Sequence, residues 1–283
     1  MTTHAPPTLT AEHLTFGFPG RQILDAVGFA LHPGTITCLL GGNGAGKTTL
    51  FNIITGFLQP HTGTLHLGKT SLTGHPPYRI SRLGVARTFQ DLRLIGKLSV
   101  RDNILLAQPQ HPGERIGRAL LPQLNINFAK RLACSLSLRG RVGVGETDMA
   151  SKSVVRERDT ADQRKTDTLL EEFFLAQVAD HTASEISYGQ QKLLTLACCA
   201  AMDASLLLLD EPVAGISPEF RERIAERLDS FKATGKTILL IEHQADFLEH
   251  TGDAFLYLQA GKLHRFDTLD QLRAAPVAHD AFV

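Results

Sequence analysis

Three continuous apolar runs predict strands that are buried on both faces. They are Thr35-Ile36-Thr37-Cys38-Leu39-Leu40, the four leucines of 206–209, and Thr237-Ile238-Leu239-Leu240-Ile241. A strand with one wet face alternates apolar and polar residues, whereas a run without alternation is typical of a parallel sheet covered on both sides. The last two runs are separated by a helix candidate from Pro218 to about Phe231. We therefore expect an α/β fold around a parallel sheet.

Shorter strands are predicted on both sides of this core. From about Thr8 to Leu31, short apolar stretches alternate with Gly and Pro, a pattern that predicts antiparallel strands, and Thr62–Gly68 adds another. Near the end of the chain, 254–258 and 263–266 predict a hairpin, and Thr268 is positioned to cap a last short helix. The N-terminal third is then a mixed β layer.

The middle of the chain, residues 98–183, predicts a helical insert. Ser99 with Asp102 forms a cap pattern for a helix that runs through Leu106, and the apolar pairs 169–170 and 173–174 recur at helical spacing. Between them, Arg139–Glu146 and Ser151–Ser153 are rich in glycine and serine, and Arg156–Asp167 is dense in charge. We expect a loop there that runs into a solvated helix.

The segment between the first buried run and the next helix candidate carries the clearest chemistry. Gly41-Gly42-Asn43-Gly44-Ala45-Gly46-Lys47-Thr48 is a complete G-x-x-x-x-G-K-[ST] phosphate loop. Glycines let successive backbone N–H groups surround phosphate oxygens, and a helix from about Lys47 to Thr55 presents its N-terminus to the anion. Lys47 supplies a positive charge and the Thr48 hydroxyl can ligate Mg²⁺. The alternative is an ordinary glycine-rich turn.

Composition narrows the class of protein. The chain has 283 residues with 43% apolar, enough for a substantial core, and its 29 basic residues balance 29 acidic ones. This balance argues against a nucleic-acid partner. The first residues show no basic region followed by an apolar stretch, and no run is long enough to span a bilayer, so we expect a soluble, cytosolic protein. Without a C-x-x-C pair, we interpret the cysteines as reduced core thiols: Cys38, Cys134, Cys198 and Cys199.

Polar residues follow the other two buried runs as well. Asp210-Glu211 comes directly after the leucine run, and Glu242-His243 directly after 237–241. Ligands of open parallel sheets bind beyond the carboxyl ends of the strands, so these groups are expected to meet the glycine loop. Asp210 is then the carboxylate on the metal side, and Glu211 orients and deprotonates an attacking water. The alternatives are a cap or surface ion pair for Glu211 and a structural role for His243.

A further segment identifies a family. Ile186-Ser187-Tyr188-Gly189-Gln190-Gln191-Lys192 resembles the signature segment of ATP-binding cassette proteins. The resemblance extends in order over nearly the whole chain, through the glycine loop, Gln90, this segment, the leucine run with Asp210, and His243. It implies two ATP molecules sandwiched between two cassettes, each signature facing the phosphate loop of the other. The alternative is an ordinary serine N-cap, which would have the same local structure.

The resemblance also implies roles for individual residues. Gln90 would sense the metal and the water, and His243 would contact the γ-phosphate. Phe18 fits the family spacing for stacking on adenine better than Phe16, although a plain strand phenylalanine is the alternative. The implied cofactors are ATP and Mg²⁺, with Thr48, Gln90 and Asp210 on the metal. The nucleotide is assigned to Phe18, Gly41, Gly42, Asn43, Gly44, Ala45, Gly46, Lys47, Thr48 and Thr49, and on the partner's side to Ser187, Gly189 and Gln190.

A narrower resemblance points to a subgroup. Tyr188, the stretch Arg87–Leu94 and the long insert look like the ATPase subunits of importers for branched-chain amino acids and for urea or amides. That subgroup implies a second cassette subunit, identical or related, two transmembrane permeases, a periplasmic or extracellular solute-binding protein, and a peripheral position on the cytoplasmic face of the inner membrane. Apolar Leu92, Leu94 and Ile95 are candidates for the permease surface, with core packing as the alternative.

The sequence departs from the family at three places. Ser217, which is shorter and neutral, stands where the family usually has Asp or Asn, so we expect altered coupling between the two sites. Lys192 stands where arginine is common, and Cys198-Cys199 replaces an arginine-containing turn. We expect ion pairing there to differ from that of the family, since arginine and lysine are not equivalent.

The resemblance implies an α/β P-loop (RecA-like) three-layer core with an N-terminal antiparallel β subdomain and an inserted α-helical subdomain. We expect one cassette domain over 8–283, with 8–97 and 184–283 as the nucleotide-binding core, 98–183 as the insert and 1–7 as a flexible N-terminus. The expected function is ATP hydrolysis that drives an importer. The alternatives are a soluble cassette acting on ribosomes or nucleic acid, which the single phosphate loop disfavours, and a phosphate-loop kinase.

Overall fold

The computed structural model describes residues 8–88, 94–109 and 147–278, with side chains from Thr160 onward in the last range. At its centre lies a six-stranded sheet in the order β10-β9-β3-β8-β7-β6. Only β10 runs antiparallel to its neighbour; the pairs from β9 to β6 are all parallel. The strands are β3 Ile36–Leu40, β6 Val85–Arg87, β7 Leu206–Asp210, β8 Thr237–Ile241, β9 Ala254–Gln259 and β10 Lys262–Phe266.

The three apolar runs form adjacent central strands, as predicted. Successive residues of a strand point to opposite faces, and here the two faces belong to different buried clusters. Leu207 and Leu209 of β7 lie in one cluster, whereas Leu206 and Leu208 lie in the other. Both faces are therefore dry, which is the physical reason why these strands show no polar alternation.

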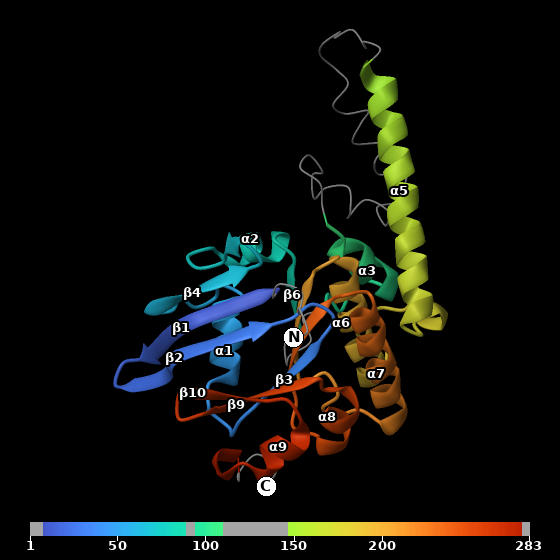
Figure 1. Cartoon of the computed structure of the whole chain (residues 1–283). Coiled ribbons are helices and arrows are strands. Elements are labelled where there is room, and N and C mark those ends of the chain that lie inside the picture. Colours follow the sequence, from blue (N-terminus) through green and yellow to red (C-terminus); the bar gives the residue numbers. More distant parts are fainter. Residues whose placement is uncertain (1–7, 89–93, 110–146, 279–283) are drawn as a thin grey trace.

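One face of this sheet is covered by the N-terminal third of the chain (Figure 1). A four-stranded antiparallel sheet in the order β2-β1-β4-β5 packs there together with helix α1, and its apolar side chains share a cluster with Leu39 and Leu239. The predicted antiparallel strands are thus confirmed. Their bounds are β1 Leu9–Phe18, β2 Arg21–Leu31, β4 Thr62–Leu67 and β5 Thr70–Ser71, and α1 spans Lys47–Ile54.

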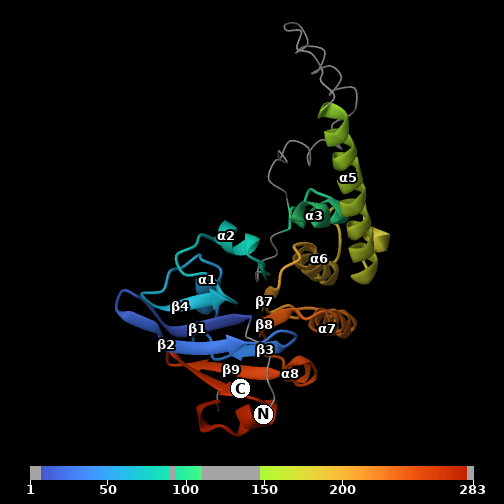
Figure 2. The same cartoon turned by 45° about the horizontal axis from the view of Figure 1, so that its top comes forward.

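Helices cover the opposite face, as the two views show (Figures 1 and 2). They are α6 Tyr188–Ala201, α7 Pro218–Ala233, α8 Ala245–Thr251 and α9 Leu269–Ala274, followed by a 3₁₀ turn, η2 Pro276–Ala278. Cys38 of β3 and Cys199 of α6 are buried free thiols in the cluster between the sheet and this layer, and Cys198 is half-buried. Burial raises the pKa of the Cys199 thiol to about 12, so these groups stay protonated at neutral pH.

The two ends of the inserted region are joined side by side. Backbone hydrogen bonds link Val100 to His181 and Ala183 to Leu98, and Ser99 pairs with Thr182 as a β-bridge. Within the insert lie α3 Val100–Ala107, α5 Thr147–Glu172 and η1 Ala176–Val178. The α5 helix extends well beyond the rest of the fold in both views (Figures 1 and 2). No helix within the described part of the chain is both long and apolar enough to cross a membrane.

The structure corrects several predicted boundaries. Ser151–Ser153 lie inside α5, so the loop predicted there is wrong; serine costs a helix only about 0.5 kcal/mol relative to alanine, which its neighbours can offset. Phe174 is not helical, because its positive φ of 58° ends the helical course after Glu172. The short elements β6, α8 and α2 Pro77–Arg82 were not predicted. Each has at most seven residues, too few for a periodic pattern.

The turn after β3 depends on one glycine. Gly41 has φ 149°, and a β-carbon at this position would overlap the carbonyl oxygen of Leu258 in the neighbouring strand β9. Gly42, the next residue, has open space around the corresponding position. A β-carbon at Gly41 would therefore displace the neighbouring strand, whereas a β-carbon at Gly42 would meet no other atom.

We expect Gly41→Ala to lower the free energy of unfolding by at least about 2 kcal/mol, from backbone strain and steric overlap. Gly42→Ala is the control and should change stability by less than about 1 kcal/mol. Urea denaturation of both variants without nucleotide measures the difference. Equal stability of the two variants would contradict this account of the turn.

Candidate functional site

The three central strands deliver their polar residues to one edge of the sheet. Strand β8 lies between β3 and β7, and Ile241 pairs with both Leu39 and Asp210. The carboxyl ends of the three strands are therefore level. The glycine loop, Asp210-Glu211 and Glu242-His243 leave the sheet at this edge, as the sequence predicted.

The phosphate-loop lysine lies over its own loop. Lys47 Nζ donates to the carbonyl oxygens of Gly41, at 2.5 Å, and Gly42, at 3.1 Å. Partial burial lowers the pKa of Lys47, and the negative charges of Glu211 and Asp210 act in the opposite direction. Those charges reach Lys47 from the end of β7, so the loop and the acidic pair share one electrostatic environment.

The loop runs directly into α1. Gly46 precedes the helix with φ 112°, and a β-carbon there would lie 2.7 Å from Ile23 Cγ2. Thr48 is exposed in the first turn and Thr49 is half-buried. The N–H groups of a helix's first turn have no partners within the helix and attract anions. The segment Gly41–Thr49 can therefore hold phosphate groups.

Asp210 is a buried carboxylate with a basic neighbour. Its residue is 6% exposed, and Arg87 Nη2 lies 3.5 Å from Oδ2. The backbone N–H of Asp210 donates to Thr88 Oγ1 at 3.0 Å. Burial raises the pKa of Asp210, and the charge of Arg87 is the main influence that lowers it. Asn52 of α1 in turn accepts a hydrogen bond from Arg87 at 2.7 Å, so Arg87 ties the end of β6 to α1 and to β7.

Glu211 and His243 face each other across neighbouring strand ends. Glu211 Oε1 lies 3.8 Å from His243 Nδ1, and the two side chains are 24% and 64% exposed. Glu211 has φ 48°, in the left-handed region that residues with a β-carbon rarely adopt. Strained backbone of this kind is concentrated at functional sites. The carboxylate can accept a proton from water, and the imidazole can contact an anionic group beside it.

A buried glutamate that the sequence analysis did not assign organises this edge. Glu242 is 2% exposed. Its Oε1 accepts from the backbone N–H of Val213 at 3.2 Å, and its Oε2 accepts from that of His243 at 2.9 Å. One carboxylate thus holds the segments after β7 and β8 together. The signal for Glu242 in the sequence was its position as a charged residue directly after an apolar run.

The segment Ser187–Gln190 starts α6 as a complete capping box. Gln190 N donates to Ser187 Oγ at 3.3 Å, and Ser187 N donates to Gln190 Oε1 at 2.9 Å. Ser187 is exposed and Gln190 half-buried. A β-carbon on Gly189 would lie 2.6 Å from the Phe220 ring of α7, so this glycine is required for helix packing as well. Ser217 is exposed at the N-cap position of α7.

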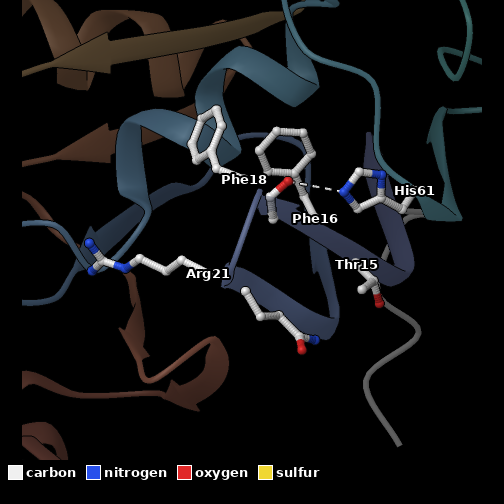
Figure 3. Close-up of a pocket in the computed structure, with 7 residues that line it drawn as sticks. Thr15, Phe16, Phe18, Arg21 and His61 are labelled. Atoms are coloured by element: carbon white, nitrogen blue, oxygen red, sulfur yellow. Dashed lines mark hydrogen bonds between the residues drawn. The ribbon is translucent and has the colours of Figure 1, made fainter.

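A shallow pocket of about 260 Å³ lies beside the two aromatic candidates (Figure 3). The Phe16 and Phe18 rings are 5.2 Å apart in an edge-to-face arrangement, and His61 stacks on Phe16. Phe18 is 52% exposed and Phe16 only 6%. Arg21 connects this region to the phosphate loop through a 3.4 Å hydrogen bond to the Gly44 carbonyl. The lining residues are Thr15, Phe16, Gly17, Phe18, Arg21, Gln22 and His61.

Not every candidate can be placed. Gln90 and Leu92 lie outside the described residues, as does Cys134. No role was predicted for Arg87 or Thr88, although both precede Gln90 in the stretch that suggested the subgroup. Their contacts with Asp210 depend on the pairing of β6 with β7, and a three-residue strand gives no sequence pattern that predicts such pairing.

Sequence comparison finds relatives over nearly the whole chain. A family model described as "ABC transporter" matches residues 24–214. The high-affinity branched-chain amino acid transport ATP-binding protein LivG of Escherichia coli strain K12 is 33% identical over 271 residues, covering 95% of each chain. BraF of Pseudomonas aeruginosa, with the same description, is 30% identical over 278 residues, covering 98% of each.

Structural comparison gives the same fold. MJ1267, described as an ATP-binding cassette of an ABC transporter and solved in its ADP conformation, matches with a TM-score of 0.74 at 24% identity, over 98% of both chains. This likeness confirms the expected three-layer cassette fold with its β subdomain. The family match covers more than half of the chain, and both relatives are at least 30% identical to it over 95% or more of its length. The chain belongs to the ABC transporter family and is an ATPase of that family.

Proposed function

We propose that this chain is the ATP-hydrolysing subunit of an importer, with Glu211 as the general base. The observation that carries the proposal is the meeting of Lys47, Asp210, Glu211 and His243 at one edge of the parallel sheet. A phosphate loop beside a paired carboxylate and imidazole suits attack of water on a γ-phosphate.

The reaction needs one proton transfer and one bond exchange at phosphorus. The water oxygen bonds to the γ-phosphorus while the bond to the β,γ-bridging oxygen breaks, which gives ADP and phosphate. Glu211 takes a proton from the water, and Lys47 and the N–H groups of Gly41–Thr49 bind the phosphate oxygens. His243 contacts the γ-phosphate from the neighbouring strand end.

The residues present fit a magnesium ion. The Thr48 hydroxyl and the buried Asp210 carboxylate are oxygen donors of the kind that Mg²⁺ prefers, and Gln90 is the third proposed ligand. When bound, the ion neutralises charge on the phosphate oxygens. Asp210 must be ionised for this role, and Arg87 favours its ionised form.

The complete site requires a second cassette. Ser187, Gly189 and Gln190 start a 14-residue helix whose first N–H groups can bind an anion, and we assign them to the nucleotide held by the other subunit. That subunit is a second copy or a related chain. ATP then closes the dimer, and hydrolysis lets it open.

Relatives support the importer role and its partners. LivG and BraF are described as branched-chain amino acid transport proteins, and we propose this cargo, or urea and amides, for the permeases that the chain serves. We place it on the cytoplasmic face of the inner membrane with two permeases and a solute-binding protein. Among the described candidates for the permease surface, Ile95 is 46% exposed, whereas Leu94 packs against the helical layer, so we favour Ile95 over Leu94 as a permease contact.

The division of the chain follows from the same proposal. We assign 8–97 and 184–283 to the nucleotide-binding core and 98–183 to the insert. The hydrogen bonds that join Leu98 to Ala183 and Val100 to His181 support these boundaries.

Glu211→Gln tests the proposed base. We expect turnover to fall about 100-fold or more, because the amide cannot accept the proton, while ATP binding persists and an ATP-dependent dimer accumulates. Phosphate release and analytical ultracentrifugation measure the two effects. Glu219→Gln, a change in an exposed glutamate paired with Arg223, is the matched control. Wild-type turnover in Glu211→Gln would remove Glu211 from its role.

Phe18→Ala tests the adenine contact. Aromatic stacking on a base is worth about 1–3 kcal/mol, so the dissociation constant for ATP should rise about 5- to 150-fold without loss of folding. Phe16→Ala should instead cost about 3–5 kcal/mol of stability, because that ring is buried. Calorimetric ATP titration and thermal melting distinguish the two. If only Phe16→Ala weakened ATP binding in a stably folded protein, Phe16 would be the stacking residue.

Arg87→Met tests the ionisation of Asp210. Loss of the guanidinium removes the main influence that lowers the pKa of Asp210, so that pKa should rise and the acidic limb of kcat/KM should shift to higher pH. Arg87→Lys retains the charge and should shift the limb less. A pH profile of ATP hydrolysis measures both variants. An acidic limb that stays in place in Arg87→Met would show that Asp210 does not set it.

A further inference from the structure

Lys192 is a charged residue buried next to the proposed catalytic glutamate. It lies five positions after Ser187 on α6 and is 5% exposed. Its Nζ donates to the backbone carbonyl of Glu211 at 2.9 Å and lies 5.5 Å from the centre of the Tyr188 ring. Lysine is rarely buried unless its charge has partners, so its burial here calls for a physical reason.

The backbone of Glu211 is held from three directions. Its N–H donates to the Ile241 carbonyl of β8 at 2.9 Å, and its carbonyl accepts from Ala214 N at 3.3 Å and from Lys192 Nζ. The residue keeps its left-handed φ of 48° within these contacts. Among the three donors and acceptors, only Lys192 comes from α6.

The charges around the ammonium favour this position. Asp210 precedes Glu211, and the positive charges of Arg87 and Lys192 lower the pKa of Asp210 against the effect of burial. The Tyr188 ring presents a π-system to the ammonium at a distance typical of cation–π contacts. Lys192 is therefore stabilised by a carbonyl, a ring and a carboxylate, all within the site.

We propose that Lys192 is a positioning residue for Glu211 and that it links the signature end of α6 to the hydrolytic carboxylate of the same subunit. The inference rests on the proposed function. Ser187 and Lys192 share one rigid helix, about 7.5 Å apart along its axis. Nucleotide contact at Ser187 therefore moves the donor that holds Glu211, and ATP held by one subunit conditions hydrolysis at the other subunit's loop.

Lys192→Met is the central variant. Methionine has a similar length and no donor, and the Glu211 carbonyl keeps its bond from Ala214. Lys192→Arg retains a long cationic donor. Lys165→Met is the matched control, because Lys165 Nζ donates to the carbonyl of Ala201 at the other end of α6, at 3.0 Å. If Lys192→Met does not fold, Lys192→Gln, polar but shorter, takes its place with the same expectation.

The expected result separates kcat from binding. Lys192→Met should lower kcat about tenfold or more while the dissociation constant for ATP changes less than about twofold, since the lost contact acts on the base. Lys192→Arg should recover most of the rate, and Lys165→Met should retain it. In a Glu211→Gln background, Lys192→Met should leave the residual rate unchanged within about twofold, because a residue that acts through Glu211 has nothing left to position.

Three outcomes would overturn the inference. The first is a wild-type kcat in Lys192→Met, and the second is a loss of kcat in Lys165→Met equal to that in Lys192→Met. The third is that Lys192→Met lowers the rate by the same factor in the Glu211→Gln background as it does in the wild-type background. Failure of the proposed function has a different signature. If the wild type released no phosphate, or if Glu211→Gln turned over normally, the assignment of the site itself would fall. If Glu211→Gln were inactive and Lys192→Met fully active, only the role of Lys192 would fall.

Discussion

The parallel pairing of β3, β8 and β7 is the constraint on which the rest of the structure depends. Because the three strands run in the same direction side by side, their carboxyl ends share one edge, and the residues that follow them must meet there. The pairing is possible because both faces of the sheet are covered, by α1 and the antiparallel sheet on one side and by α6 to α9 on the other. Burial of both faces therefore permits the parallel pairing, and the parallel pairing brings the polar groups together at one edge.

The polar residues at this edge are held by buried hydrogen bonds. Glu242 accepts from two backbone N–H groups, and Arg87 contacts both Asp210 and Asn52. A buried charge without partners costs several kcal/mol, so each contact both offsets burial and fixes a segment in place. The strained backbone of Glu211 persists because surrounding contacts determine it. The outcome is a preorganised edge, which electrostatic catalysis requires.

Helix α6 connects two parts of the proposed mechanism. Its N-cap is the exposed Ser187, which forms a capping box, and its second turn carries the buried Lys192. A helix is a stiff element, so a change at one turn is transmitted to the next. Gly189 packs against Phe220 of α7, which extends the same mechanical unit to the segment that follows Glu211. In the proposed mechanism, these few direct contacts couple the surface offered to a partner cassette with the Glu211 carboxylate of the same chain.

The sequence alone determined the central strands, the phosphate loop, the cap of α6 and the convergence of Asp210-Glu211 with Glu242-His243 at one edge of the sheet. These features have local signals: a dry strand is continuously apolar, and a phosphate loop or cap requires particular residues at fixed spacing. The role of Arg87, the buried clamp of Glu242 and the bond from Lys192 to Glu211 were decided only by the tertiary structure. Each joins residues far apart in the chain, through the pairing of β6 with β7 or the packing of α6 on the sheet. The segment Ser151–Ser153 likewise predicts a loop when its residues are considered alone, whereas in the structure helix α5 continues through it. Such contacts depend on which elements pack together, and a short pattern of residue types does not predict that packing.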